Sequence, residues 1–378
     1  MNIGIVCYPT YGGSGVVATE LGKGLAARGH KVHFISYTQP ARLDIFMENI
    51  FYHEVAMVHY PLFEHSPYVL ALTGKLVDVV KYEKLDVLHV HYAIPHATAA
   101  NLAQQILASQ GIRVAVVTTL HGTDVTLVGK DPTYEPVVSY AINQSDAVTA
   151  VSEFLKADTY RHFSVNREIE VIPNFIDLHR FSHKAKSHFK MAIAPNGERI
   201  VTHVSNFRKV KRIDLVIQVF KGIRDALPAK LILVGDGPER QKAEQLCREL
   251  QLCDDVRFLG KQEAIEEILS VSDLFLMPSE TESFGLAALE AMACQVPVVS
   301  SDAGGLPEVN IHGQTGFLAP VDDVDGMVKH SIYILNDEEN LRAFREEALK
   351  QALRFDLVNI LPLYEHLYER TLAEAALK

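Results

Sequence analysis

Short apolar segments alternate along the first half of the chain with longer segments that repeat their apolar positions at helical spacing. Residues 3–7 form the first apolar segment, and within residues 15–28 Leu21 and Leu25 fall on one helical face. Strands that are apolar on both faces and separated by helices are typical of a parallel sheet covered on both sides. We therefore expect a doubly wound α/β domain. Its further strands are predicted at residues 31–36, 87–91, 114–120 and 147–151.

The pattern breaks near residues 172–175, and a polar segment, 182–199, precedes a second alternating series. Ligands of doubly wound sheets bind beyond the carboxyl ends of the strands. Two such domains therefore predict a site in a cleft between them. The strands of the second domain are predicted at residues 200–204, 230–234, 256–259, 274–277 and 296–300, with helices between them such as 238–250 and 264–271.

Composition narrows the class of protein. The 378 residues include 36 Lys or Arg and 47 Asp or Glu, which gives a net charge of −11. Because nucleic-acid binders present basic surfaces, we expect no nucleic-acid partner. The chain shows neither a secretory signal nor an apolar segment of membrane-spanning length. We expect a cytoplasmic protein whose four cysteines, Cys7, Cys247, Cys253 and Cys294, are reduced and packed.

The glycine-rich segment Gly12–Gly15 lies between the first predicted strand and the first predicted helix. Small residues there let a ligand approach the free amides at the helix N-terminus. Gly13, Gly15 and Ala18 nearly match a nicotinamide dinucleotide fingerprint. However, the second strand ends at Ser36-Tyr37, without the acidic residue that would hold a ribose. We favour a ligand-binding turn that is not specific for a dinucleotide, with a plain turn as the alternative.

Histidines end two adjacent predicted strands of the first domain. His121 is followed by Gly122, Thr123 and Asp124, small or polar residues that can present donors to a sugar or an anion. His91 ends the strand before it. His89 and His91 could pair on a metal, but the sequence offers no third ligand, so we predict no metal site.

Three further segments of the second domain are candidates for contact with a ligand. Cations in the segment 208–212 would oppose the dipole of the following helix unless an anion such as a diphosphate lay there. Gly235–Pro238 is equally well explained as a turn with Pro at the first helical position. Asp323 and Asp325 resemble a metal-binding pair, but we interpret them as a helix cap.

The most specific pattern is Glu282 followed eight residues later by Glu290. Glu282 lies in a predicted loop, and residues 284–286 open a helix whose amides can bind phosphate or hydroxyl groups. Glu290 lies in an otherwise apolar helix, where a carboxylate is costly unless it is hydrogen-bonded. The vicinal diol of a ribose is a suitable partner, and Gly304–Glu308 would close the same pocket.

Together the Glu282-x7-Glu290 pattern, the Gly12–Gly15 loop, the Lys211 segment and Gly304–Glu308 resemble family 4 glycosyltransferases of the GT-B fold. The resemblance extends over nearly the whole chain. It implies two facing Rossmann-like domains, sugar transfer from a nucleotide donor with retention at the anomeric carbon, no cofactor and no metal. It implies an acceptor-binding domain of residues 1–172 and 357–378, a nucleotide-sugar-binding domain of residues 173–356, and a homo-oligomer.

Longer phrases resemble one subgroup of this family, whose members transfer N-acetylglucosamine from UDP-N-acetylglucosamine to the hydroxyl of L-malate in bacillithiol biosynthesis. The alternatives are a lipid or polysaccharide acceptor, a UDP-N-acetylglucosamine 2-epimerase, a nicotinamide dehydrogenase and a sugar-nucleotide sensor without catalysis. The matching phrases are residues 7–15, 91–96, 119–124, 174–177 and 205–212.

The resemblance assigns the donor-binding roles residue by residue. Glu290 should hold the ribose hydroxyls, and Glu282 the sugar hydroxyls. Relatives carry an Arg five residues before Lys211, where this chain has Asn206, so we expect Arg208 to supply that cation. The remaining donor contacts are expected from the backbone of Phe284 and Gly285 (sugar), from the Leu286 amide and Lys211 (diphosphate), and from Gly13.

The resemblance also implies the catalytic and acceptor residues. His121, Lys211 and Glu282 are expected at the reacting centre, with attack on the same face and the leaving diphosphate taking the acceptor proton. A relative with an anionic acceptor carries a tyrosine at the position of Tyr92. For malate we predict Ser14, Tyr92, Thr123 and Arg42.

Overall fold

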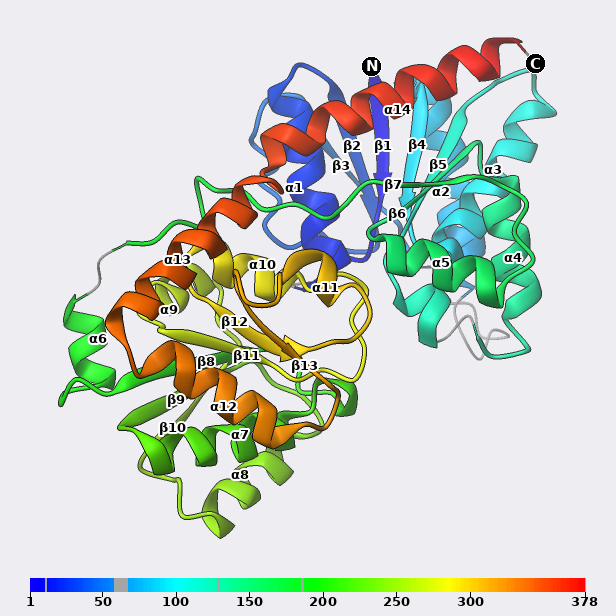
Figure 1. The fold of residues 1–378 in the computed structure, drawn as a ribbon. Coiled ribbons are helices and arrows are strands. Elements are labelled where there is room, and N and C mark those ends of the chain that lie inside the picture. The colour runs from blue at the N-terminus through cyan, green and yellow to red at the C-terminus, as the bar shows by residue number, and fades with distance from the viewer. Residues whose placement is uncertain (11, 58–66, 128–129, 185–186, 378) are drawn as a thin grey trace. The chain divides into compact units, whose positions relative to one another are not determined.

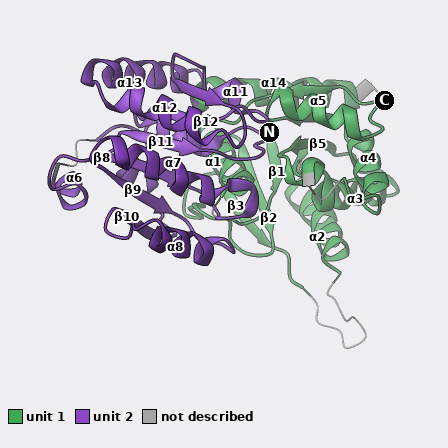
Figure 2. Cartoon of the chain, turned by 60° about the horizontal axis from the view of Figure 1, so that its bottom comes forward, with its two compact units in different colours: residues 1–175, 357–378 green, residues 176–356 purple. Residues whose placement is uncertain are grey.

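A computed structural model describes residues 1–10, 12–57, 67–127, 130–184 and 187–377. They form two compact units, residues 1–175 with 357–378 and residues 176–356 (Figure 2). Each unit contains one sheet, and the paired strands of both sheets are parallel. The α/β class expected from the sequence is confirmed. The sequence predicts the first change of domain after residue 172, and in the structure it follows Phe175.

The sheet of the first unit has the strand order β3-β2-β1-β4-β5-β6-β7 (Figure 1). Its central strands are buried along nearly their whole length, as their continuous apolar pattern predicts. The strands are β1 (Asn2–Val6), β2 (Lys31–Ser36), β3 (Ile50–Glu54), β4 (Val87–His91), β5 (Ala115–Leu120), β6 (Ala147–Ala150) and β7 (Ile169–Val171). The helices are α1 (Ser14–Ala27), α2 (Tyr68–Glu83), α3 (Thr98–Ala108), α4 (Glu135–Gln144), α5 (Glu153–His162) and α14 (Leu357–Leu377).

Successive residues of β4 face opposite sides of this sheet. Val90 packs in an apolar core with α2 and α3, which contribute Leu72 and Ala103. His89 faces the other side, where its Nδ1 atom lies 2.7 Å from the hydroxyl of Tyr368 in α14. The C-terminal helix α14 therefore covers the first unit and packs beside α1.

The sheet of the second unit has the order β10-β9-β8-β11-β12-β13. Helices α7, α8, α12 and α13 share an apolar core with one face, and α6 and α9 pack on the other. The strands are β8 (Arg199–Val204), β9 (Ala229–Val234), β10 (Val256–Gly260), β11 (Leu274–Met277), β12 (Val298–Ser301) and β13 (Gly316–Ala319). The helices are α6 (Ser187–Ile193), α7 (Ile213–Ala226), α8 (Arg240–Glu249), α9 (Ile265–Leu269), α10 (Leu286–Ala293), α11 (Leu306–Val309), α12 (Val324–Leu335) and α13 (Glu338–Leu353).

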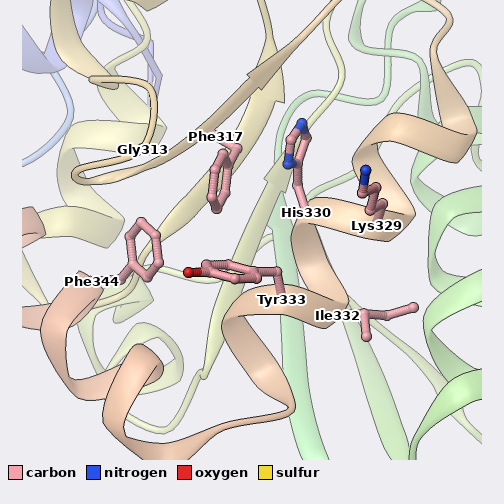
Figure 3. A pocket seen from close by; sticks show the side chains of 7 residues that line it. All are labelled: Gly313, Phe317, Lys329, His330, Ile332, Tyr333 and Phe344. Carbon is pink, nitrogen blue, oxygen red and sulfur yellow. The ribbon is translucent and has the colours of Figure 1, made fainter.

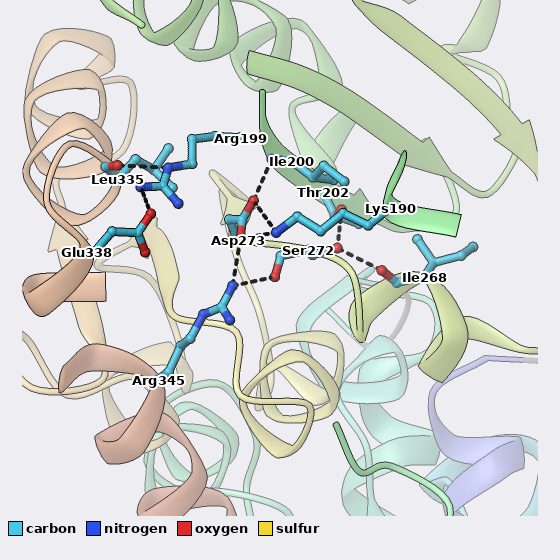
Figure 4. A network of polar contacts seen from close by, with 10 residues as sticks. All are labelled: Lys190, Arg199, Ile200, Thr202, Ile268, Ser272, Asp273, Leu335, Glu338 and Arg345. Atoms are coloured by element: carbon cyan, nitrogen blue, oxygen red, sulfur yellow. Dashed lines mark hydrogen bonds and ion pairs between the residues drawn. The ribbon is translucent and has the colours of Figure 1, made fainter. Parts of the chain in front are cut away.

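A buried carboxylate fastens helices to this second sheet. The side chain of Asp273, only 1% exposed, precedes β11 and accepts hydrogen bonds from Lys190 of α6 at 3.0 Å and from Arg345 of α13 at 2.7 Å (Figure 4). It also accepts the backbone amide of Ile200 in β8 at 2.9 Å. Because a buried charge without partners is strongly destabilising, these contacts hold α6, α13 and the sheet in one arrangement.

The sequence pattern missed three strands, and each of them lies at an edge of its sheet. β3 and β7 end the first sheet, and β13 ends the second. β3 has only one buried residue, Ile50, so it lacks the continuous apolar run that marks a central strand. Edge strands face solvent on one side, and apolar patterning alone therefore detects them poorly.

Other differences are local. Cys7, Cys247 and Cys294 are buried free thiols as expected, but Cys253 is exposed, so the expectation that all four are packed is wrong. Pro238 lies in a turn before α8 and is not its first residue. The Asp323 carboxylate caps α12 by accepting the Gly326 amide, which confirms the interpretation of that segment. Within the described residues, no helix combines the length and the hydropathy that crossing a bilayer requires.

Candidate active site

The predicted donor residues of the second unit gather where its strands end. The loops after β8, β9, β11 and β12 lie at one edge of the sheet, because all these strands are parallel. The loops pack on one another so closely that a side chain would not fit. A Cβ atom on Gly235 would lie 1.7 Å from the Ser205 carbonyl oxygen, and one on Gly304 would lie 1.9 Å from the Glu282 carbonyl oxygen. Glycine is therefore required at both positions for the loops to meet.

Lys211 and Glu282 form an ion pair in this edge. The Lys211 ammonium bonds the Glu282 carboxylate, which also accepts the Ser279 hydroxyl at 3.0 Å. The two side chains are 21% and 11% exposed. A backbone hydrogen bond of 2.9 Å from the Glu280 amide to the Val210 carbonyl holds the two loops together. The structure thus joins two predicted site residues that are 71 positions apart in the chain.

Helix α10 starts directly after this ion pair. Gly285, in the left-handed conformation with a φ of 101°, is its N-cap, and Phe284 before it is buried. Leu286 opens the helix and Glu290 follows one turn later, so both lie on the same side of α10. Glu290 is a buried carboxylate that is only 8% exposed. The start of α10 therefore has backbone amides without partners inside the helix, with Glu282 in the loop before it and Glu290 one turn into it.

The cations of the basic segment 208–212 differ in their partners. Arg212 is the N-cap of α7, and it bonds Asp214 at 3.0 Å and also Asp322. Its pKa is raised, first of all by the hydrogen bond to Asp214. Protein carboxylates therefore already compensate its charge at the helix N-terminus. Arg208 is exposed, and its carbonyl accepts the Lys211 amide at 2.8 Å.

His203 supports this edge and was not identified from the sequence. It is a buried residue of β8 that donates from Nδ1 to the Leu276 carbonyl at 2.8 Å and accepts the Ser205 hydroxyl at Nε2. Burial lowers its pKa to about 4, so it is neutral in ordinary buffers. It holds the start of the loop that carries Lys211. No sequence signal marks a histidine inside an apolar strand as functional.

Three predicted acceptor residues converge at the corresponding edge of the first unit. Ser14 opens α1 after its N-cap Gly13, and Tyr92 follows β4. Their hydroxyl oxygens lie 2.5 Å apart and share a hydrogen bond. The Thr123 side chain also bonds the Tyr92 hydroxyl, whose pKa burial raises to about 12. Three neutral hydroxyls therefore meet at the N-terminus of a helix that no described side chain caps.

His121 lies beside the cluster of three hydroxyls formed by Ser14, Tyr92 and Thr123. Its Nε2 atom shares a 2.7 Å hydrogen bond with Nδ1 of the buried His91, and its ring centroid is 5.4 Å from that of Tyr92. Burial, followed by the charge of His96, lowers the His121 pKa to about 3. The imidazole is therefore neutral and acts as a hydrogen-bonding group.

Asp124 joins the two loops that carry Tyr92 and His121. Its carboxylate accepts the Ala93 amide at 2.8 Å and the Gly122 amide at 3.1 Å. Burial raises its pKa to about 6, although the backbone hydrogen bonds act in the opposite direction. The sequence motif contained Asp124 but gave it no role. Its position identifies it as a residue that fixes the geometry of the edge.

Arg42, the fourth predicted acceptor residue, lies in the loop between β2 and β3. It is half-buried, and its φ of 65° is left-handed.

A separate cavity of about 600 Å³ lies in the second unit near β13, α12 and α13 (Figure 3). None of the predicted site residues lines it. The lining residues are Gly313, Phe317, Lys329, His330, Ile332, Tyr333 and Phe344.

Family models match both halves of the chain. Residues 11–180 match the model described as Glycosyltransferase Family 4. Residues 185–351 match the model described as Glycosyl transferases group 1. These ranges contain the three clustered hydroxyls of the first unit (Ser14, Tyr92 and Thr123) and the Lys211–Glu282 ion pair of the second unit.

One curated relative is similar over nearly its whole length. The chain is 47% identical over 370 residues to "N-acetyl-alpha-D-glucosaminyl L-malate synthase" of Bacillus anthracis, covering 97% of this chain and 96% of that protein. Solved structures share the fold at lower identity. A sucrose-phosphate synthase from Thermosynechococcus elongatus has a TM-score of 0.81 at 24% identity, covering 99% of each chain. HepE of Anabaena, solved with UDP and glucose, has a TM-score of 0.83 at 21% identity, covering 98% of this chain and 99% of that one.

Proposed function

This chain is a hexosyltransferase that belongs to the family 4 glycosyltransferases with the GT-B fold, and we propose that it transfers N-acetylglucosamine from UDP-N-acetylglucosamine to the hydroxyl of L-malate. The observation that carries this proposal is the similarity to the Bacillus anthracis synthase, 47% identical over 97% of the chain. The product would be N-acetylglucosaminyl-malate, as bacillithiol biosynthesis requires.

The second unit is suited to the nucleotide sugar. Glu290 on α10 would accept hydrogen bonds from the two ribose hydroxyls. The Leu286 amide at the start of α10 and the Lys211 ammonium would hold the diphosphate, because the amide carries a partial positive charge and the ammonium a full one. Glu282, with the backbone of Phe284 and Gly285, would bind the sugar hydroxyls.

The first unit is suited to a small dianion that carries a hydroxyl group. Ser14, Tyr92 and Thr123 place three hydroxyls together, and both Ser14 and Thr123 bond the Tyr92 hydroxyl. They lie at the N-terminus of the 14-residue helix α1, which has no acidic residue in its first turn. Helix N-termini favour carboxylates by about 0.3–1 kcal/mol or more when partly buried. Arg42 would add a cation from the loop after β2, and Gly13 leaves the helix amides open to substrate.

The mechanism follows from the charge that develops during transfer. As the bond between the anomeric carbon and the diphosphate oxygen breaks, negative charge grows on the diphosphate. Lys211, Arg208 and the α10 amides would stabilise that charge, which removes the need for a metal ion. The malate oxygen forms the new bond on the same face, and its proton passes to the departing diphosphate. Neutral His121 would donate a hydrogen bond to the sugar near the reacting carbon.

Glu282 is poorly suited to act as a nucleophile in a two-step retention mechanism. Its Oε1 atom already accepts hydrogen bonds from Lys211 and Ser279, which hold the carboxylate in the loop. Direct transfer on one face therefore accounts better for retention.

The test is UDP release from UDP-N-acetylglucosamine by the purified protein, with L-malate, without an acceptor, or with succinate, which lacks the hydroxyl. We expect release only with malate, unchanged by EDTA, and a product of the mass of N-acetylglucosaminyl-malate. Equal release without malate would indicate hydrolysis or epimerisation. No release with any of the three would contradict the assignment of donor and acceptor together.

A further inference from the structure

A second cluster of chemically capable side chains lies in the first unit, at the β3 edge of its sheet. His33 of β2, His53 of β3 and Glu83 at the end of α2 each point one ligand atom toward the others (Figure 1 shows these elements). All three ligand atoms lie within 4.8 Å of one another. The His33 Nδ1 and His53 Nε2 atoms are 2.9 Å apart. The proposed transfer reaction uses none of these residues.

The fold brings these residues together from three separate segments. β2 and β3 are parallel with Ile35 opposite His53 and His33 opposite Phe51, so His33 and His53 lie on the same face of the sheet. Ile35 packs in the core beneath α2, which places that face under the helix. Helix α2 then ends at Glu83, above the two histidines.

The helix end that carries Glu83 is anchored. The Asn2 side-chain amide donates to the carbonyl oxygens of Glu83 and Lys84, each at 3.2 Å. Lys84 ends the helix in the left-handed conformation. The backbone of Glu83 is therefore held near the sheet, while its long, exposed side chain can change rotamer to move its carboxylate.

We propose that His33, His53 and Glu83 form a binding site for one divalent transition-metal ion of the zinc type. Two imidazoles and one carboxylate are a ligand set that zinc accepts, whereas magnesium and calcium prefer oxygen alone. Zinc–nitrogen bonds of about 2.0–2.1 Å in a tetrahedral site require the two nitrogens to lie about 3.3 Å apart. The present separation of 2.9 Å needs only a small rotation of the two rings.

The state of the two histidines suits a metal. Burial lowers the pKa of His33 to about 4 and also lowers the pKa of His53, so burial favours the neutral form of both rings. When a metal binds, the proton between His33 Nδ1 and His53 Nε2 would move to the other nitrogen of the ring that carries it. The Glu83 carboxylate attracts positive charge to both rings, while Lys31 near His33 and Lys75 near His53 oppose it.

A bound ion would join β2, β3 and α2 at one edge of the sheet. β3 is an edge strand, hydrogen-bonded on one side only. Three protein ligands leave a fourth position for water or another small ligand. The expected consequence is a more stable first unit, with no effect on sugar transfer. The binding site therefore stands or falls independently of the proposed function.

The experiment uses the full-length protein after treatment with a chelator. We expect one Zn²⁺ per chain in competition with a chromophoric chelator, and a rise in melting temperature of about 5–10 °C at a free concentration 100 times Kd. Mg²⁺ should have no effect. Co²⁺ should give the visible bands of a tetrahedral site without a thiolate charge-transfer band, which excludes the exposed Cys253 as a ligand.

Variants decide whether these three residues bind the ion. Glu83→Gln changes only an exposed carboxylate and should raise Kd by about tenfold or more, and His53→Gln should abolish tight binding. The matched controls Glu369→Gln, His188→Gln and Cys253→Ser change exposed residues elsewhere and should bind as the wild type does. Failure of the wild type to bind zinc would overturn the proposal, as would unchanged affinity in both Glu83→Gln and His53→Gln.

Discussion

Replacing Glu282 with Gln separates two roles of the Lys211 ammonium group. In the structure this group pairs with the Glu282 carboxylate, and in the proposed complex it holds the donor diphosphate. The two acceptors compete for one ammonium group. Glu282→Gln should therefore strengthen binding of UDP, which makes only the diphosphate contact. It should weaken turnover of UDP-N-acetylglucosamine, which also needs a carboxylate at the sugar hydroxyls.

The burial of the Lys211–Glu282 ion pair sets the expected size of the change in UDP affinity. Side chains that are 21% and 11% exposed lie between the surface and the core. Exposed ion pairs contribute about 0–1 kcal/mol, and hydrogen bonds to charged groups about 1.5–3 kcal/mol. We therefore expect about 1.4 kcal/mol, a tenfold lower Kd for UDP. The lost contact to the sugar should lower kcat/KM by about 10- to 100-fold.

Calorimetric titration with UDP measures the first effect, and initial rates of malate-dependent UDP release measure the second. Lys211→Met should shift UDP affinity in the opposite direction. Glu280→Gln is the matched control, since it removes a nearby carboxylate that lies 3.6 Å from Arg212. UDP affinity that is equal in the wild type and Glu282→Gln would refute the competition, and undiminished affinity in Lys211→Met would refute the diphosphate contact.

Three further outcomes are expected. Tyr92→Phe removes the central hydroxyl of the acceptor group and should raise the KM for malate about tenfold or more while leaving the KM for donor unchanged in steady-state assays; an unchanged malate KM would exclude this role. Burial lowers the His96 pKa from 6.5 to about 4, so the unfolded chain binds this proton more tightly than the folded one. The free energy of unfolding should then fall as the pH decreases from 6.5 toward 4, by about 1.4 kcal/mol per pH unit for each such histidine. In the His96→Gln variant, the free energy of unfolding measured with urea should depend less steeply on pH. Asp273→Asn removes a buried carboxylate from two partly exposed cations and should cost about 1.5–3 kcal/mol in urea unfolding, whereas Asp322→Asn, at a side chain that is 63% exposed, should cost less than about 1 kcal/mol.

The positions of the site loops could be read from the sequence because a parallel sheet constrains them. Once the strands ending at His91, Leu120 and Met277 are recognised, the segments after them must lie at the carboxyl edge of a sheet. The motif that contains Glu282 and Glu290 follows such a strand directly. The order of these residues along the chain therefore predicts their place at the sheet edge.

The partners within the site could not be read in the same way. Nothing in the local pattern shows that Lys211 pairs with Glu282, that Ser14 shares a hydrogen bond with Tyr92, or that Asp124 accepts the Ala93 amide. These contacts depend on how neighbouring loops fold over the sheet edge. Side-chain directions at that edge follow from tertiary packing, not from hydrophobic periodicity.

The sequence by itself determined the α/β class, the buried central strands and the family, because continuous apolar segments and short motifs act locally. Only the tertiary structure showed the three edge strands β3, β7 and β13, the neutral His91–His121 pair and the cluster of His33, His53 and Glu83. An edge strand has one solvated side and so loses the apolar signal. A cluster drawn from two strands and a helix exists only after the sheet has aligned them, since no spacing within the chain encodes a contact between segments that register and packing bring together.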